Sequence, residues 1–386
     1  MYNKVTLAKE TKSTSNEINF DSIKVELSSY LQLDFDYDFM TEIILATAVS
    51  IELDYPVWIM IIAPPSTGKT EMLNILKADK YFHSITCLTN KFFFSGDERS
   101  QGGYMNRIVK NKGLLAFPDF TTVTSLEHRK RKEIFNHLRI IHDGRAGLGS
   151  GIDTGDINYW EGKVAVVACV TESINKIKDT ENDLGDRFIY YNNKFWRKTK
   201  SFHFQRNLTG RKKVQKIVKK FLDQRRKKLT SINISSTQKE FLIDVCKFIS
   251  HARTPVIRNG YSREIIEVHQ PEGIHRLLNA IEGLFKCLLC VNGDESRSRR
   301  IIRQVAFASI PASRYQVISI FVSSRKESLY LDDITKRIPV SVTKTRRDVE
   351  DLVAIKVLHC DKHKDANLNE YEFNPNFQQL WSKCIA

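Results

Sequence analysis

The sequence predicts an α/β fold built on a parallel sheet, followed by a smaller, mostly helical part. Three short apolar runs are typical of buried strands: Val57–Ile62, Gly113–Phe117 and Val164–Val170. Helical patterns separate them, among them Ser125–Ile141. Because strands that alternate with helices are typical of βαβ units, we expect these strands to lie parallel in one sheet.

Composition excludes several classes of protein. The chain has 386 residues, of which 41% are hydrophobic, so it is not disordered throughout. No apolar run approaches the ~20 residues of a membrane span, and Met1–Glu17 lacks the apolar centre of a secretory signal. Seven cysteines without a regular spacing indicate reduced thiols, so we expect a cytoplasmic protein with no membrane partner.

Periodicity and composition divide the chain into four segments. We expect a flexible leader over residues 1–20, an α/β core over 21–200, a basic helical region over 201–310 and a C-terminal module over 311–386. Within the third segment, Arg211–Leu229 predicts an amphipathic helix with its apolar residues inside and its basic residues outside.

The formal net charge of +15 indicates a polyanionic partner. Between Phe195 and Leu229 there are 14 basic residues and one acid, Asp223. Lys and Arg side chains that neutralise phosphates are a major sequence-independent source of affinity for nucleic acid, so we expect DNA contact here. A solvated helix face is the alternative. The candidate contacts are Lys212, Lys213, Lys219 and Lys220.

The first apolar strand runs into Ala63-Pro64-Pro65-Ser66-Thr67-Gly68-Lys69-Thr70, and a helical pattern follows. A loop of this kind between a strand and a helix is a Walker A motif, which binds nucleotide phosphates. We expect Gly68 to admit the phosphates, Lys69 to reach the β and γ oxygens, and the Thr70 hydroxyl to bind Mg²⁺. ATP and Mg²⁺ are therefore the expected cofactors. The first position of the motif is Ala63 rather than glycine. This end of the loop tolerates a small residue, so the departure does not exclude the motif.

Polar residues follow the other two strands. Asp119 is placed as a Walker B carboxylate that binds Mg²⁺. Phe120 stands where many ATPases have the Glu that orients the attacking water, so the sequence does not identify that base. Thr171 either positions water beside the γ-phosphate or caps the next helix.

These motifs, in this order, resemble the AAA+ ATPase domain. The resemblance is closer to a subset found in phage, plasmid and genomic-island replication proteins, similar to minichromosome-maintenance-like helicases. It covers roughly Asp21–Ile310. The residues that carry it are Trp58–Thr70, Pro118–Thr122, Leu138–Gly144, Trp160–Lys163 and Leu184–Phe188.

The resemblance implies roles for three further parts of the chain. Arg187 is in the position of an arginine finger, which projects into the nucleotide of a neighbouring subunit. Arg276 resembles the sensor 2 arginine of a helical lid, in contact with the γ-phosphate; an ordinary exposed helix arginine is the alternative. The glycine-rich segment His142–Trp160 is in the place of a pore hairpin that touches DNA, with Arg145 as its basic residue; a plain surface loop is the alternative.

The C-terminal module predicts a winged helix-turn-helix: three helices, then a strand, a loop and a strand. Ser341 is expected to cap the third helix, which would present Lys344, Arg346 and Arg347 to a DNA major groove. A protein–protein module is the alternative. We interpret Cys287 and Cys290 as core residues rather than metal ligands.

The sequence therefore predicts an ATP-driven, DNA-translocating replicative helicase of a mobile element. By the resemblance it forms a hexameric ring, with single-stranded DNA in the pore and duplex at the winged module. Lys69, Thr70 and Asp119 of one subunit and Arg187 of the next would share each ATP. Two alternatives stay open: an AAA+ initiator or loader without processive unwinding, and a non-enzymatic, sequence-specific DNA-binding regulator.

Overall fold

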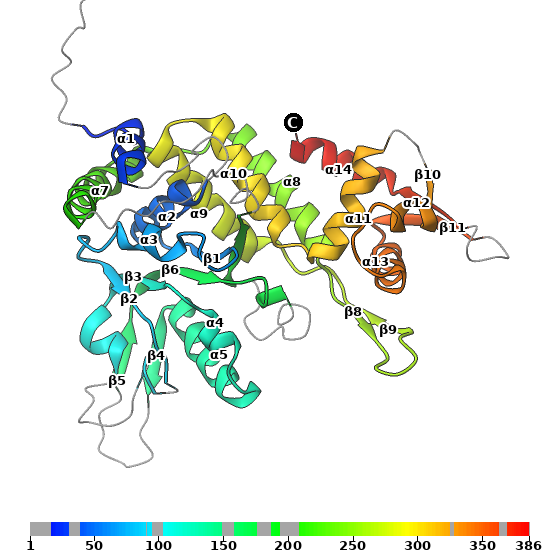
Figure 1. Ribbon diagram of the computed structural model, residues 1–386, viewed down its shortest axis with the longest axis horizontal. Coiled ribbons are helices and arrows are strands. Elements are labelled where there is room, and N and C mark those ends of the chain that lie inside the picture. The colour runs from blue at the N-terminus through cyan, green and yellow to red at the C-terminus, as the bar shows by residue number, and fades with distance from the viewer. Residues whose placement is uncertain are drawn as a thin grey trace, which may run out of the picture.

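Five strands form a sheet that is parallel throughout, with helices on both of its faces (Figure 1). The computed structural model describes residues 17–30, 39–89, 91–94, 103–148, 158–175, 187–193, 208–324, 328–362 and 369–385. The strand order is β2-β3-β6-β1-β7. The strands are β1 (Trp58–Ile62), β2 (Phe82–Ser84), β3 (Lys112–Phe117), β6 (Lys163–Val170) and β7 (Ile189–Asn192). The predicted α/β fold with a parallel sheet is confirmed.

Helices cover both faces of this sheet. In β1, Ile59 and Ile61 pack into a core with α1, α2, α3, α7 and α9, whereas Trp58 and Met60 pack with α4 and α5. Because successive side chains of a strand point to opposite faces, a strand that is covered on both sides is a continuous apolar run. These helices are α1 (Phe20–Tyr30), α2 (Met40–Val49), α3 (Lys69–Asn74), α4 (Thr121–Thr124), α5 (His128–Asp143), α7 (Leu208–Lys228) and α9 (His275–Asn292).

Two strands and one short helix of this region were not predicted from the sequence. The strands β2 and β7 lie at the two edges of the sheet, and their sequences, Phe-His-Ser and Ile-Tyr-Tyr-Asn, are not apolar runs. Edge strands are covered less completely, so they need less apolar sequence. The helix expected over Ser125–Ile141 is α5, which begins at His128, and the short helix α4 precedes it without having been expected.

The helix α7 matches the helix predicted over Arg211–Leu229, and its apolar side is inside: Val214, Val218, Phe221 and Leu222 are buried. The expectation that its basic residues all face outward is wrong at Arg225 and Arg226, which are 6% and 7% exposed. Arg226 donates to the Asp79 carboxylate and to the Ala48 carbonyl oxygen (2.9 Å). A guanidinium can be buried where a carboxylate and carbonyls satisfy it.

The start of the described chain is attached to the same helix. Arg225 donates to Glu17 Oε1 (2.8 Å) and to the Ile18 carbonyl oxygen (2.7 Å), and Phe20 is buried. Residues 17–20 of the expected leader are therefore attached to the rest of the protein, and its residues 1–16 lie outside the described part of the chain.

The region after α7, expected to be helical, contains a strand hairpin as well as helices. It consists of α8 (Ser236–Ala252), the antiparallel hairpin β8 (Val256–Arg258) and β9 (Ile265–Val268), α9, and α10 (Glu295–Ala308). The cysteines of α9, Cys287 and Cys290, are buried in its core, as expected.

The last segment has the expected three helices and two strands, with one additional strand and one additional helix. Its three strands pair antiparallel in the order β10-β12-β11. The Ser341 hydroxyl accepts a hydrogen bond from the Lys344 N–H, which confirms the predicted cap. The elements are α11 (Ala312–Ser323), β10 (Ser328–Tyr330), α12 (Leu331–Thr335), α13 (Val342–Ala354), β11 (Leu358–Asp361), β12 (Glu370–Phe373) and α14 (Pro375–Ile385).

The additional helix α14 joins this segment to the rest of the protein. Its Trp381 stacks on Phe307 of α10 with ring centroids 4.9 Å apart, and lies 5.2 Å from Phe248 of α8. One apolar core therefore continues from Phe20 to Cys384 across residue 311. Among the described residues, none of the helices has the length and apolarity that crossing a membrane requires.

Candidate functional site

The carboxyl ends of the parallel strands meet at one edge of the sheet, which we call the carboxyl edge. Here the Ala63 N–H donates to the Val170 carbonyl oxygen (3.1 Å), and the Phe120 N–H donates to the Cys169 carbonyl oxygen (2.7 Å). Since β6 lies between β1 and β3, Thr171 stands next to the loop after β1, and Asp119 one strand further away. The three predicted polar elements are brought to one edge.

The loop after β1 turns sharply before α3 begins. Ser66 and Gly68 both have positive φ, 61° and 80°, and Gly68 is the N-cap residue of α3. A left-handed conformation at the cap favours glycine, which explains the Gly at this position. The Thr67 hydroxyl donates to the Pro64 carbonyl oxygen (2.9 Å) and closes the loop.

The Lys69 ammonium lies inside this loop. Its Nζ donates to the carbonyl oxygens of Ala63 and Pro64, both at 2.6 Å. Burial lowers the pKa of Lys69, and the nearby Asp119 carboxylate opposes that effect. Cys169 lies close as well, but burial raises the pKa of its thiol to about 12, so it stays uncharged at neutral pH. Asp119 therefore provides the negative charge facing Lys69.

The oxygen donors at this edge suit Mg²⁺ better than zinc. Thr70 is exposed in the first turn of α3, and Asp119 is exposed beyond β3, where its Oδ1 accepts from the Thr121 N–H (3.0 Å). No group of three or more His, Cys, Asp or Glu side chains in the described residues is arranged to hold a metal ion. Mg²⁺ is typically held by one or two protein oxygens together with phosphates and water.

Two residues at this edge, Phe120 and Glu172, bear on which side chain could orient an attacking water. Phe120 is fully buried, so the residue after Asp119 belongs to the core and not to the chemistry. Glu172 is exposed directly after Thr171 and brings a second carboxylate to the edge. Glu172 was not predictable from the sequence, because the Glu of a typical ATPase is expected beside Asp119 and not after the third strand. The Thr171 hydroxyl lies 2.8 Å from that of Ser173.

A cavity of about 210 Å³ opens at the same edge, between the ends of β1 and β7 and the helices α10 and α11. Aromatic rings and side-chain amides line it. Phe307 and Tyr315 stack with ring centroids 5.4 Å apart. The amides come from Asn175, Asn192 and Gln304.

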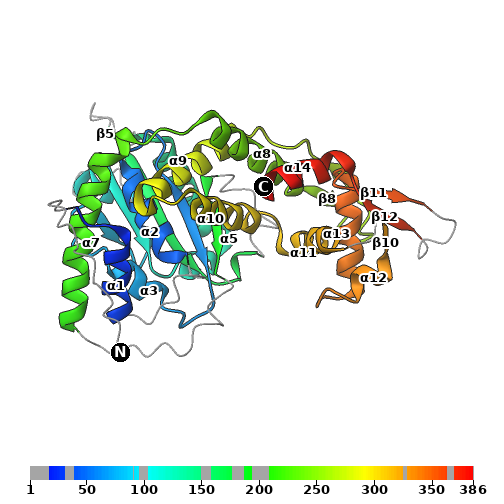
Figure 2. The same ribbon diagram turned by 90° about the horizontal axis from the view of Figure 1, so that it is seen from above.

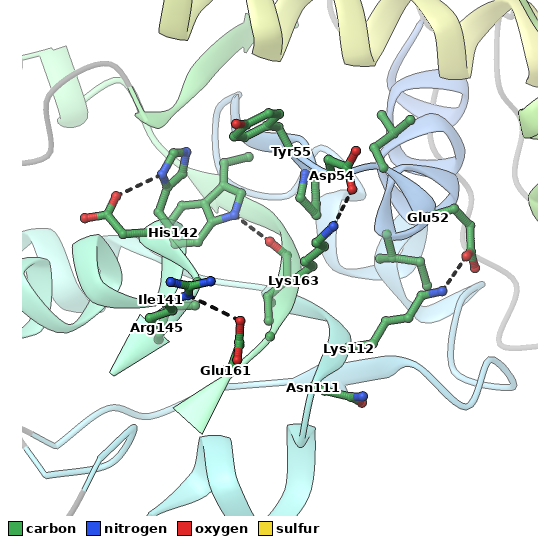
Figure 3. Close-up of a pocket in the computed structure, with 18 residues that line it drawn as sticks. Glu52, Asp54, Tyr55, Asn111, Lys112, Ile141, His142, Arg145, Glu161 and Lys163 are labelled. Carbon is green, nitrogen blue, oxygen red and sulfur yellow. Dashed lines mark hydrogen bonds and ion pairs between the residues drawn. The ribbon is translucent and has the colours of Figure 1, made fainter. Parts of the chain in front are cut away.

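A cavity of about 800 Å³ lies at the opposite edge, where β1, β3 and β6 begin. We call this the amino edge. Figure 3 shows that its basic side chains are paired with carboxylates: Lys112 with Glu52, Lys163 with Asp54, and Arg145 with Glu161. These three pairs leave no net charge on the part of the cavity wall that they form.

Arg187 and Arg276 both belong to the amino edge. Arg187 stands just before β7, and its Nη2 lies 3.4 Å from Asp143 Oδ1 at the end of α5. Arg276 is exposed in the first turn of α9, close enough for its charge to lower the pKa of Arg187 and of His142. The His142 ring packs edge-on against Trp58, the first residue of β1. At about 3.3 Å per strand residue, the two arginines lie roughly 15 Å or more from their own Lys69 loop.

The predicted DNA contacts are separated in space. The helices α7 and α13 lie at opposite ends of the molecule in both views (Figures 1 and 2). On α7, Lys213 pairs with Glu26 and Lys219 with Asp223, both at 2.8 Å. Lys212 and Lys220 are exposed and form no ion pair with a described residue, and neither does Lys216. Lys212, Lys216 and Lys220, four residues apart, lie on one face of the helix.

The two other candidate DNA surfaces are the start of α13, which is partly exposed, and the predicted pore segment, which is partly described. On α13, Arg346 is exposed and Arg347 is half-buried, while Lys344 donates to Asp348 (2.9 Å). The predicted pore segment begins and ends as the hairpin β4 (Arg145–Leu148) and β5 (Asn158–Glu161). Its residues 149–157 lie outside the described residues.

The chain matches no model of a known protein family and no curated protein.

Proposed function

We propose that this protein is an ATPase that acts on DNA as a ring, with each ATP bound between two copies of the chain. The observation that carries the proposal is the Lys69 loop. Its ammonium is held inside a tight loop at the carboxyl edge of a parallel sheet, near the Asp119 carboxylate. This arrangement is typical of sites that bind the phosphates of a nucleotide.

In this proposal the residues of the carboxyl edge hold Mg²⁺ and ATP. Lys69 exchanges its two carbonyl partners for the β and γ phosphate oxygens, and the Thr70 hydroxyl and the Asp119 carboxylate bind the metal. Mg²⁺ held there would supply charge neutralisation on the phosphates for transfer of the γ-phosphoryl group to water. Glu172 or Thr171 orients that water from the neighbouring strand end.

The base of the nucleotide has a candidate pocket beside this loop. The 210 Å³ cavity begins at Ile62, directly before Ala63, so a ligand held by the loop can extend into it. Aromatic rings with a few amide groups are a common lining for a planar heterocycle. We infer that the base enters between the ends of β1 and β7, near Tyr315.

The separation of the two edges supports a site shared between subunits. Arg187 and Arg276 are too far from their own Lys69 loop to touch the nucleotide held there. If both arginines contact phosphate, they do so on a neighbouring copy, which applies to Arg276 as well as to the predicted finger. A closed ring is the usual outcome of such head-to-tail contacts.

DNA is the proposed polyanionic partner. The net charge is +15, and the exposed lysine face of α7 and Arg346 of α13 supply cations at two ends of the molecule. The α13 module, with its capped third helix and its three-stranded antiparallel sheet, supports a winged helix-turn-helix that binds duplex. The β4–β5 hairpin at the amino edge is the proposed pore element for single-stranded DNA.

The decisive experiment is ATP turnover with and without single-stranded DNA, followed by strand displacement on a forked duplex. Turnover stimulated by DNA together with displacement is the expected result for a helicase. Turnover without displacement would instead favour an initiator or loader of AAA+ type. DNA binding without turnover would overturn the enzyme and favour a DNA-binding regulator.

A further inference from the structure

The charge balance of the amino edge changes at one corner. Along most of the large cavity each basic side chain has its own carboxylate. At the corner formed by the end of α5, Asp143 accepts from Arg187 Nη2 at 3.4 and 3.5 Å, and lies 3.5 Å from His142 Nδ1. Arg139 and Arg276 add positive charge that acts on Arg187. Three arginines therefore lie within electrostatic range of one another at this corner, with Asp143 against one of them.

The contact between Arg187 and Asp143 is suited to exchange. The Arg187 side chain is 12% exposed, whereas the Asp143 side chain is 60% exposed. Both hydrogen bonds are long for a charged pair, since such bonds typically measure about 2.7–2.9 Å. A weakly held, exposed carboxylate can leave a guanidinium when a stronger anion arrives.

Asp143 also stands where a helix disfavours it. It is the last residue of α5, and Gly144, with φ 80°, caps the helix. The C-terminal end of a helix carries partial negative charge, so an acidic residue there is unfavourable for the helix itself. The stability of α5 therefore does not explain an acidic residue at this position.

We propose that Asp143 is the positioning residue for Arg187: it holds the guanidinium at the edge of the free subunit and releases it to the terminal phosphate of the nucleotide bound by the neighbouring copy. This inference rests on the proposed function, because it needs Arg187 to act across a subunit boundary. Asp143 itself does not touch the phosphate; it keeps Arg187 in the orientation that the phosphate then takes over.

The test is steady-state ATP turnover of the assembled protein carrying Asp143→Asn. We expect kcat to fall about tenfold while KM for ATP is unchanged, because the misplaced group is on the other edge from the Lys69 loop. Asp143→Glu should recover part of the loss. The matched control is Asp54→Asn, an exposed carboxylate of the same cavity that pairs with Lys163, and it should keep wild-type kcat.

Two further measurements separate positioning from a structural role. Asp143→Asn should unfold at the same temperature as wild type or slightly higher, since it removes a charge that the helix end disfavours. In an Arg187→Ala background, Asp143→Asn should cause no additional loss, because the residue it positions is absent. A lowered melting temperature, an undiminished kcat, or an equal additional loss in that background would each overturn the inference.

The proposed function fails in a distinguishable way. Wild-type turnover in Lys69→Ala, or in Arg187→Ala alone, would remove the ATP site or its finger, and this inference would fall with it. Slow Arg187→Ala together with normal Asp143→Asn would overturn only the role of Asp143.

Discussion

The carboxyl edge and the amino edge of the sheet differ in the partners of their charged side chains. At the carboxyl edge, Lys69 donates to main-chain carbonyls and Asp119 is exposed. At the amino edge, most charges meet opposite charges, and Arg187 rests on a carboxylate. In the proposed function, the first arrangement accepts a ligand and the second exchanges one partner for another. On that proposal the two edges are halves of one site that a single chain cannot bring together.

The largest expected effect tests the carboxyl edge. Lys69→Ala should abolish ATP turnover, because the loop loses the cation that faces the β and γ phosphates. DNA binding should largely survive, since the basic surfaces lie elsewhere. Turnover measured by phosphate release checks this, with Lys77→Ala, an exposed lysine shortly after α3, as the control. Wild-type turnover in Lys69→Ala would reject the loop as a phosphate site.

The next effect tests whether the edges cooperate between subunits. Arg187→Ala should slow turnover by on the order of 10³-fold while nucleotide still binds. Mixing it with Lys69→Ala should restore partial activity, because some interfaces then combine an intact loop with an intact Arg187. Turnover of the mixture is compared with that of each variant alone after subunit exchange. No recovery in rings shown to be mixed would argue against action across the boundary.

A third effect tests how well the amino edge shields His142 from water. Burial, with Arg187 and Arg276 nearby, lowers the pKa of His142 from 6.5 to about 4. The unfolded chain therefore gains a proton below pH 6.5 that the folded chain takes up only near pH 4, so stability is complete above pH 6.5 and is lost toward pH 4. Urea unfolding should show a loss from this residue of about 2 kcal/mol between pH 7 and pH 5.

The variant His142→Gln isolates this contribution. It should lose less stability over the same pH interval, whereas His128→Gln, on the exposed first turn of the same helix, should behave as wild type does. An identical pH dependence in His142→Gln and wild type would mean that the amino edge is more open to water than the structure indicates.

The smallest effect asks whether DNA binds away from both edges. Replacing Lys212, Lys216 and Lys220 by Gln should reduce the slope of log K against log salt by roughly 2 to 3, at about 0.7–0.9 for each phosphate contact. The matched control replaces Lys213 and Lys219, which are already paired with carboxylates, and should change the slope less. Equal slopes for wild type and the triple variant would assign this face of α7 to solvent.

Sequence periodicity located what is locally encoded. The strands β1, β3 and β6 were predictable because burial on both faces makes them uninterrupted apolar runs. The cap at Ser341 and the inner side of α7 were predictable because a cap and a helical stripe are spaced by the helix itself. The strands β2 and β7 were not, since three or four mixed residues at a sheet edge carry no such pattern.

The same limit explains the errors on α7. Basic residues on a helix are predicted to face water, which holds for Lys212 and Lys220. It fails for Arg225 and Arg226, because Glu17 and Asp79, far away in the sequence, come to meet them. No periodicity reports a partner that is 147 or 208 residues away.

The sequence by itself determined the α/β class, the loop around Lys69 and the polar residue after each buried strand, because these depend on neighbouring residues. Only the tertiary structure decided which of them meet. The parallel pairing of β1, β3 and β6 brings Lys69, Asp119 and Thr171 to one edge, and the place of β7 beside β1 puts Arg187 on the other. Strand order depends on contacts between distant segments, and it separates the proposed finger from the loop of its own chain.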